Sequence, residues 1–483
     1  MELSRIAKNK VVFYLGSRYL TYFIKFVTSL IIAVKLGPFY MGIWGAILLI
    51  LNYFQQCHFG IAYSFPIFYV QNKDDEDVCF SYALNSIALL GFLSIFVFLT
   101  YAFFSVFENS FFVKYHIYRF YLWICIIAVL QYYQDFFLQL FRVKNKIVHV
   151  TVCQSLVVIL NFFCAFFFEQ DELIWALLAG YLLGLLLCCL LAFFSKDFTN
   201  IIHAKLSFKI QRKILKKGIF LFVYGACFYF IFISIRTIIS NFYGVEEFGL
   251  FTFSYTVANA FFLLFGAISF LITPKLLVKL SSDDRIVIAE AIHSIRTVMI
   301  TSSHLLIYLA IILFPVLLYF IPKYESSITS FNLVALAILM NSNVTGYSEL
   351  LLARNREKCL ALLSFGALII NLLLGVFLAK FMQLSYDLIV LATLVAYSFY
   401  SFTVVYVGEG VIHKNMITHL IRCWFPLRLA VPYCIAILIC ILNMGYMYRI
   451  FLLLFFVVSN MKSYRIIKPL LTRIVNKPDV VDL

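Results

Sequence analysis

The sequence is poor in charge and lacks the motifs by which many enzymes bind nucleotides or metals. Only 13% of its 483 residues are Asp, Glu, Lys or Arg, about half the share in soluble domains. There is no GxxxxGK(S/T) loop, no Gly-rich dinucleotide loop, no HExxH and no GxSxG. These absences argue against ATP binding in the usual way and against metalloprotease or serine-hydrolase chemistry.

The sequence also lacks the cysteine and histidine patterns that are typical of disulfide-linked or metal-binding folds. The twelve cysteines form no CxxC pair, and nearly all lie in apolar runs, as small hydrophobes of buried helices do. The histidines are isolated, which favours structural roles over metal binding. The basic start MELSRIAKNK leads into an apolar stretch without an A-x-A-like site, which predicts an uncleaved first span.

Apolar residues are abundant instead: 64% of the chain, including 55 Phe and 31 Tyr. This predicts an all-α, polytopic membrane protein with no sizeable soluble domain. Stretches long enough to span a bilayer predict fourteen helices, with twelve as the alternative because the last two are the weakest. They fall near residues 11–34, 39–62, 80–104, 118–140, 148–168, 173–194, 218–241, 250–272, 298–320, 328–350, 359–379, 388–407, 429–445 and 450–467.

The distribution of positive charge predicts the orientation. With the N-terminus in the cytoplasm, 29 of the 38 Lys and Arg residues lie on the inner side, six on the outer side and three within spans. This is a strong positive-inside bias, so we expect both termini in the cytoplasm and explain the net charge of +15 without nucleic acid. The inner loop with the most cations, 195–217, carries seven. It is either a topology-fixing linker or an amphipathic segment along the anionic leaflet.

An internal repeat is visible in two outer connections. Gly37 and Gly42 follow the first span, Gly244 and Gly249 follow the seventh, and each pair precedes an aliphatic and an aromatic residue. The repeat predicts two parallel six-helix lobes around a central cavity. We expect an N-terminal lobe at 1–200 (spans 1–6), a C-terminal lobe at 201–407 (spans 7–12), and additional spans 13–14 with a cytoplasmic tail at 408–483.

The run Leu36-Gly37-Pro38, with Tyr40 and Gly42, resembles the LGPxxYG-type signature of polysaccharide flippases. Span 2 up to Gly60 and Ala62, and the basic loop 142–146, are similar to that family too. The chain thus resembles Wzx-type translocases of O-antigen or capsule repeat units, in the multidrug/oligosaccharidyl-lipid/polysaccharide (MOP) exporter superfamily. This resemblance implies a bacterial inner membrane, a cationic cavity and an undecaprenyl-pyrophosphate glycolipid as cargo, with polysaccharide polymerase and chain-length machinery as further partners.

Three cations lie within predicted spans, where charge is expensive. Arg18 and Lys25 share one face of span 1 with Tyr22 between them, and Arg236 lies in span 7. Lysine and arginine suit phosphate oxygens, so we predict that Arg18, Lys25 and Arg236 bind substrate in a cationic cavity. The alternative for Arg18 is that its side chain extends to the headgroups.

Polar residues in other spans are candidates to line this cavity. Gln131 and Asp135 form a stripe on span 4, with Gln134 beside it and Gln55 in span 2. Glutamines and aromatic rings suit sugar hydroxyls, whereas the alternative is helix-to-helix packing with Asp135 paired to a cation. Asp135 and Glu349 are also candidates for coupling to H⁺ or Na⁺, unless they pair with Arg142 and Arg354. We expect no other cofactor and no metal site.

Four classes of function are compatible with this pattern. They are a flippase for a lipid-linked oligosaccharide, a cation-coupled multidrug exporter, a glycan polymerase or ligase, and a non-transporting scaffold. The cationic bias inside the spans favours an anionic cargo over organic cations. The outer connections are too short for the large outer loop of such enzymes, and a scaffold needs no buried charge. The sequence therefore predicts a flippase that works by alternating access, and not an enzyme.

Overall fold

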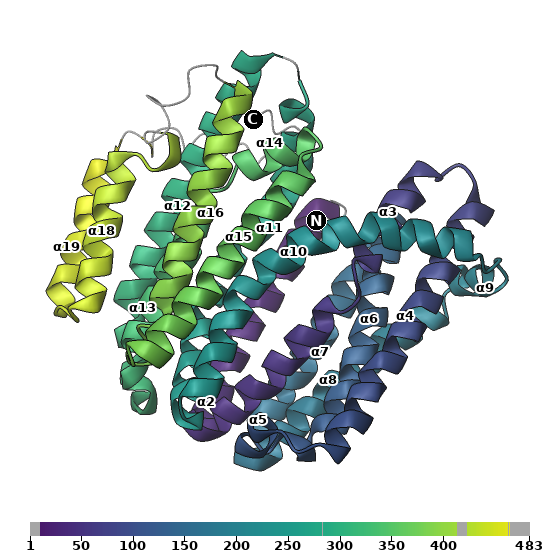
Figure 1. Ribbon diagram of the computed structural model, residues 1–483, viewed down its shortest axis with the longest axis horizontal. Coiled ribbons are helices and arrows are strands. Elements are labelled where there is room, and N and C mark those ends of the chain that lie inside the picture. Colours follow the sequence, from purple (N-terminus) through teal and green to yellow (C-terminus); the bar gives the residue numbers. More distant parts are fainter. Residues whose placement is uncertain (1–9, 283, 413–422, 462, 464–483) are drawn as a thin grey trace, which may run out of the picture. The chain divides into compact units, whose positions relative to one another are not determined.

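The computed structural model describes residues 10–282, 284–412, 423–461 and 463. This part of the chain consists of helices and turns and contains no strand (Figure 1). The all-α prediction is confirmed. A helical chain is what hydrocarbon requires, because each helix satisfies its own backbone N–H and C=O groups.

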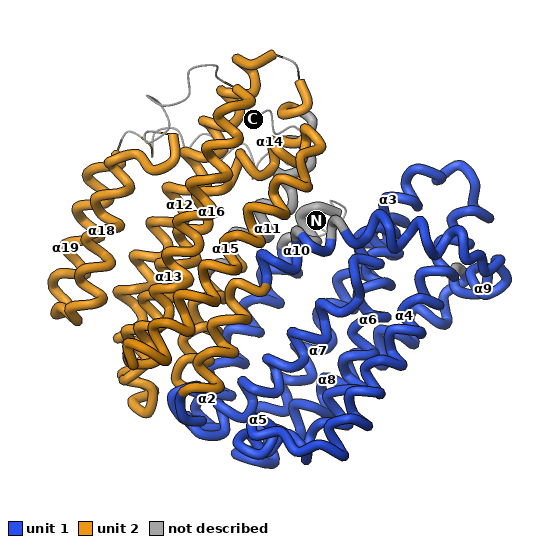
Figure 2. Tube along the Cα trace, in the orientation of Figure 1, with its two compact units in different colours: residues 1–229, 243–249 blue, residues 230–242, 250–483 orange. Residues whose placement is uncertain are grey.

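Two compact units divide the chain (Figure 2). The first comprises residues 1–229 and 243–249, and the second comprises 230–242 and 250–483. Helices α10 (Phe208–Phe242) and α11 (Val245–Leu280) contribute residues to both units. Each unit is described by itself below.

In the first unit, α2 packs against α6, α7 and α8, and α7 packs against α8. Its elements are α2 (Lys10–Gln56), α3 (Ile61–Gln71), α4 (Glu76–Val106), α5 (Ser110–Lys114), η1 (Ile117–Arg119), α6 (Tyr121–Val143), α7 (Ile147–Phe167), α8 (Gln170–Phe193) and α9 (Lys196–Ile202).

In the second unit, α13 packs against α12, α16 and α18, while α15 pairs with α16 and α18 with α19. Its elements are α12 (Arg285–Tyr319), η2 (Pro322–Ser327), α13 (Ile328–Ser342), α14 (Tyr347–Ala353), α15 (Glu357–Val376), the π-helical η3 (Phe377–Phe381), α16 (Val390–Ile412), α18 (Leu427–Ile441) and α19 (Tyr446–Ser459).

Each of the fourteen predicted spans overlaps a helix of the described residues, and residues 464–467 of the last span lie outside them. Within the described residues, nine helices are long and apolar enough to cross a membrane, or ten if the bent pair Pro322–Ser342 and Tyr347–Ala353 is one span. One of the nine is the 56-residue stretch Gly16–Gln71, which holds two predicted spans. The last two predicted spans correspond to α18 and α19, whose 15 and 14 residues are fewer than the ~20 that a full span needs. Fourteen crossings therefore remain a prediction.

The first glycine motif explains how α2 holds two spans. Its 47 residues would extend for about 70 Å as one straight helix, more than twice the hydrocarbon thickness. Gly37 interrupts the helical geometry with φ 66° and ψ 173°. A positive φ of this kind is readily adopted by glycine, so the chain bends at the place where the two predicted spans meet.

The two glycine motifs also contact each other, residue for equivalent residue. A Cβ atom on Gly42 would overlap the carbonyl oxygen of Val245, and one on Gly249 would overlap that of Pro38. Pro38 and Val245 each follow the first glycine of their motif. The contact is therefore reciprocal, as expected if the two segments are copies of one unit.

We predict that Gly249→Ala destabilises the protein, because the new methyl group would have to displace the backbone at Pro38. Overpacking of this kind typically costs about 1–3 kcal/mol. Thermal unfolding of the purified protein in detergent measures the loss. Gly16→Ala is the matched control, since a Cβ there meets nothing within 4 Å. Equal melting temperatures for the two variants would contradict the close contact.

Candidate functional sites

The cations predicted on α2 lie in two different surroundings. Arg18 donates a hydrogen bond from Nη1 to Oε1 of Gln154 on α7 at 2.6 Å, and its guanidinium lies 5.0 Å from the centroid of the Tyr22 ring. Lys25 is exposed and makes no hydrogen bond or ion pair with another described residue. Arg18 is therefore held in place by protein groups, whereas the ammonium group of Lys25 is available to a ligand.

The glutamines and Asp135 join neighbouring helices in the first unit. Gln55 of α2 donates to Oδ2 of Asp135 on α6 at 3.5 Å, and Gln134 donates to the carbonyl oxygen of Cys153 on α7 at 3.0 Å. The buried Oε1 of Gln131 has no hydrogen-bond partner in the described part of the chain. The structure thus brings Gln55 and Asp135 together and directs Gln134 to a different helix.

The alternative ion pairs, Asp135 with Arg142 and Glu349 with Arg354, are not among the ion pairs of the described residues. Two ion pairs are present there, Lys35 with Glu169 and Arg119 with Asp171. Glu349 instead accepts hydrogen bonds from the backbone N–H of Gly346 at 2.7 Å and from Ser348 at 2.8 Å. It therefore caps the first turn of α14, which gives this carboxylate a structural role.

Arg236 belongs to the second unit, separate from Arg18 and Lys25. Only 2% of its surface is exposed, and its guanidinium lies 5.2 Å from the ring centroid of Tyr255 on α11. Such a cation–π contact stabilises a desolvated guanidinium. The structure describes each cluster within its own unit, so a cavity shared by all three cations remains a prediction.

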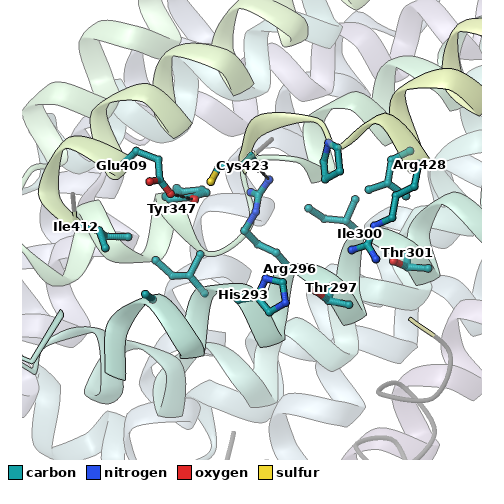
Figure 3. A pocket seen from close by; sticks show the side chains of 14 residues that line it. His293, Arg296, Thr297, Ile300, Thr301, Tyr347, Glu409, Ile412, Cys423 and Arg428 are labelled. Carbon is teal, nitrogen blue, oxygen red and sulfur yellow. Dashed lines mark hydrogen bonds between the residues drawn. The ribbon is translucent and has the colours of Figure 1, made fainter. Parts of the chain in front are cut away.

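A cavity that the sequence did not predict lies in the second unit (Figure 3). It has a volume of about 290 Å³ and is lined by residues of α12, α14, α16 and α18 and of the segment before α18. Tyr347 and Glu409 lie on one side of it, Thr301 and Arg428 lie on the other, and Arg296 lies between them. Polar groups of five separate segments therefore converge here.

Arg296 donates hydrogen bonds to backbone carbonyl oxygens of two separate segments. Nη1 donates to the carbonyl oxygens of Asn343 and Thr345, the latter at 3.1 Å, and Nη2 donates to those of Cys423 and Trp424 at 2.8 and 3.2 Å. The guanidinium also lies 4.7 Å from the Tyr347 ring centroid. One side chain thus joins the turn between α13 and α14 to the segment before α18.

A buried carboxylate completes this network. Glu409 is only 4% exposed, and the hydroxyl of Tyr347 donates to its Oε1. An acidic side chain is rarely buried this deeply without such partners. The pair therefore links the C-terminal end of α16 to the first residue of α14.

The sequence analysis does not find Arg296 and Glu409 because its spans are too short at these ends. The predicted span 298–320 starts after Arg296, whereas α12 begins at Arg285, and the predicted span 388–407 ends before Glu409, whereas α16 continues to Ile412. A signal was available: Ile288, Ala291, Ile292 and Ile295 recur at helical spacing, and all four are buried. That periodicity extends the helix through Arg296.

No group of three His, Cys, Asp or Glu side chains in the described residues could hold a metal ion. The candidate sites consist of cations, hydroxyls, amides and single carboxylates. Such groups can bind anionic or hydroxyl-rich ligands by charge and hydrogen bonding.

Solved structures with this fold are membrane transporters. The chain is similar to an inward-facing multidrug resistance MATE family transporter of the MOP superfamily, with 10% identity, a TM-score of 0.68, and coverage of 82% of this chain and 98% of that chain. It is also similar to the lipid II flippase MurJ in an inward closed conformation, with 15% identity, a TM-score of 0.68, and coverage of 96% and 100%. The protein is thus a polytopic membrane protein with the fold of these MOP-type proteins.

The family follows from the sequence match. The model of the polysaccharide biosynthesis protein family matches residues 7–274, more than half of the chain, and the chain belongs to this family. A comparison with curated proteins finds no match. The resemblance drawn from the glycine motif is confirmed at the level of this family and fold.

We predict that Arg296→Lys lowers stability by about 2–4 kcal/mol, because one ammonium group cannot replace four charge-assisted hydrogen bonds to two separate segments. Thermal unfolding in detergent measures the effect. Arg285→Lys is the matched control on the same helix, since Arg285 is exposed. A melting temperature unchanged in both variants would show that Arg296 does not hold these segments together.

Proposed function

We propose that this protein is a flippase that moves an undecaprenyl-pyrophosphate-linked oligosaccharide repeat unit from the inner to the outer leaflet of the bacterial inner membrane. The observation that carries the proposal is the match to the polysaccharide biosynthesis protein family. The matched residues 7–274 include Arg18 and Lys25, the two cations called the α2 row below. This family suggests a lipid-linked glycan of O-antigen or capsule type as the cargo. The cations on α2 suit the anionic headgroup of such a lipid.

The α2 row offers suitable chemistry for a pyrophosphate-sugar headgroup. Lys25 supplies an exposed positive charge, and Arg18 with Tyr22 supplies a guanidinium held over an aromatic ring. Phosphate oxygens favour such cations, while the ring and the amides of Gln55 and Gln131 suit sugar hydroxyls. Shielding the headgroup from hydrocarbon is the main physical task of a flippase. This task needs no covalent step, so the proposed function is not that of an enzyme.

The remaining parts of the proposal concern coupling and orientation. Both termini would lie in the cytoplasm, as the positive-inside bias predicts. Asp135, which accepts from Gln55, is the proposed site for H⁺ or Na⁺ coupling; Glu349 is less suitable because it caps α14. The polymerase and chain-length machinery that take up the flipped unit are the proposed partners.

A cation-coupled multidrug exporter is the second candidate, because one similar structure is a multidrug resistance MATE family transporter. The charges distinguish the two. An exporter of organic cations needs acidic groups in its cavity, whereas the α2 row is cationic. This difference favours the anionic, lipid-linked cargo.

The direct test is a strain lacking this protein. Lipid extracts should then contain a complete, unpolymerised repeat unit on undecaprenyl pyrophosphate, while the surface polysaccharide is lost. Mass spectrometry of the lipid would identify the glycan. Unchanged surface glycan, together with new sensitivity to cationic drugs, would instead support the multidrug exporter.

We predict that Lys25→Ala reduces glycan export at least tenfold at normal protein levels, because it removes the exposed cation. Complementation of the deletion strain, with surface polysaccharide measured per unit of membrane-inserted protein, checks this. Lys25→Arg should retain much of the export if charge is what matters. Lys73→Ala, at an exposed lysine in the turn between α3 and α4, is the control. Normal export by Lys25→Ala would remove Lys25 from the mechanism.

A further inference from the structure

The side of the second unit's cavity opposite Glu409 has the features of an anion site. Figure 3 shows Arg428 and Thr301 together there, while Glu409 and Tyr347 lie beyond Arg296. The cavity's volume of about 290 Å³ is close to the lower end of the range for small-ligand pockets, about 300–1,000 Å³. Protein interiors are otherwise packed closely, so a space of this size, with a guanidinium and a hydroxyl on a mainly apolar wall, can hold a small ligand.

Thr301 supplies a hydrogen-bonding group that the protein leaves unused. The residue is fully buried, and its Oγ1 has no hydrogen-bond partner in the described part of the chain. Thr21 and Thr28 instead donate to the carbonyl four residues earlier, whereas Thr151, Thr252 and Thr393 share the unpartnered state of Thr301. Of these four threonines, Thr301 is the one that lines the cavity. Buried hydroxyls are normally satisfied, so a ligand in the cavity would supply the partner that Thr301 lacks.

Arg428 supplies positive charge beside this hydroxyl. Its Nη1 donates to Oγ of Ser463 at 2.8 Å, and it forms no ion pair with a described residue. A guanidinium carries five N–H donors, so further donors remain for a ligand. Arg296 adds a second positive charge, although its Nη atoms are already engaged with carbonyl oxygens.

We propose that this cavity is a binding site for a phosphate group, held by the guanidinium of Arg428 and the hydroxyl of Thr301. Arginine forks and hydroxyl donors match the oxygens of phosphate. The carboxylate of Glu409 does not oppose binding there, because it is engaged by Tyr347 on the other side of Arg296. The site belongs to the second unit and does not depend on the α2 cations or on the proposed flippase activity.

The phosphate could belong to a lipid headgroup or to a small soluble anion, and the experiment separates these sources. Thermal unfolding of the purified, full-length protein in detergent is followed with increasing sodium phosphate or short-chain phosphatidylglycerol. Sodium chloride at equal ionic strength and short-chain phosphatidylcholine are the controls. We expect a saturable rise in melting temperature with at least one of the two phosphate compounds, and the one that acts at lower concentration identifies the source.

Two variants test the residues. Arg428→Gln should weaken the apparent affinity at least tenfold, and Thr301→Val should weaken it several-fold. Thr301→Val should not lower the melting temperature of the ligand-free protein, because valine fills the same space without an unsatisfied hydroxyl. This second variant keeps the test valid if Arg428→Gln fails to fold. Arg285→Gln should bind like the natural protein.

Either of two results would overturn the proposal. One is the absence of a saturable response to both phosphate compounds. The other is an equal response in the natural protein and in both cavity variants. Because the readout is binding, loss of glycan export with intact phosphate binding would bear on the proposed function alone.

Discussion

The structure depends on one constraint: backbone N–H and C=O groups that enter hydrocarbon must be satisfied within the protein. Continuous helices meet this constraint, and the places where helices break are the informative exceptions. Gly60 and Gly346 have positive φ values of 76° and 90°, and a side chain satisfies the freed N–H group at each. His58 accepts from Gly60 at 3.0 Å, and Glu349 accepts from Gly346 at 2.7 Å. Polar side chains in the apolar helices therefore often serve the backbone.

The same constraint explains how several of the described buried or half-buried cations are held. Arg296 donates to carbonyl oxygens freed near helix ends, and Lys35 donates to those of Phe166 at 2.6 Å and Phe168 at 3.3 Å. In each case an exposed backbone acceptor and a desolvated cation satisfy each other, as both are expensive alone. Lys25 and Arg428 differ because, among the described residues, neither makes such a contact with a backbone carbonyl; Arg428 donates to the hydroxyl of Ser463 instead. That difference distinguishes structural cations from those that can bind a ligand.

Hydropathy alone predicted the helical fold, because apolar runs of spanning length have few alternatives to helix in a membrane. It also placed Arg18, Tyr22 and Lys25 on one helix, since spacing fixes the face. It failed at helix ends. The helices α12 and α16 extend past their apolar runs to Arg285 and Ile412, so spans drawn from hydropathy leave out Arg296 and Glu409. The cavity was missed because its residues come from segments far apart in sequence.

The cationic excess of the chain therefore contains two populations that a count of loop charges treats alike. Exposed cations such as Lys209 and Lys213 can help to set the orientation of the protein in the membrane. That orientation depends on how many cations lie on each side and not on what they contact. Arg296 was counted with them, yet it is 8% exposed and engaged with four carbonyl oxygens. Moving an exposed lysine within its loop should leave the fold intact, whereas Arg296 acts only where it stands. Topological counting thus yields a prediction of orientation and says little about which cations build a site.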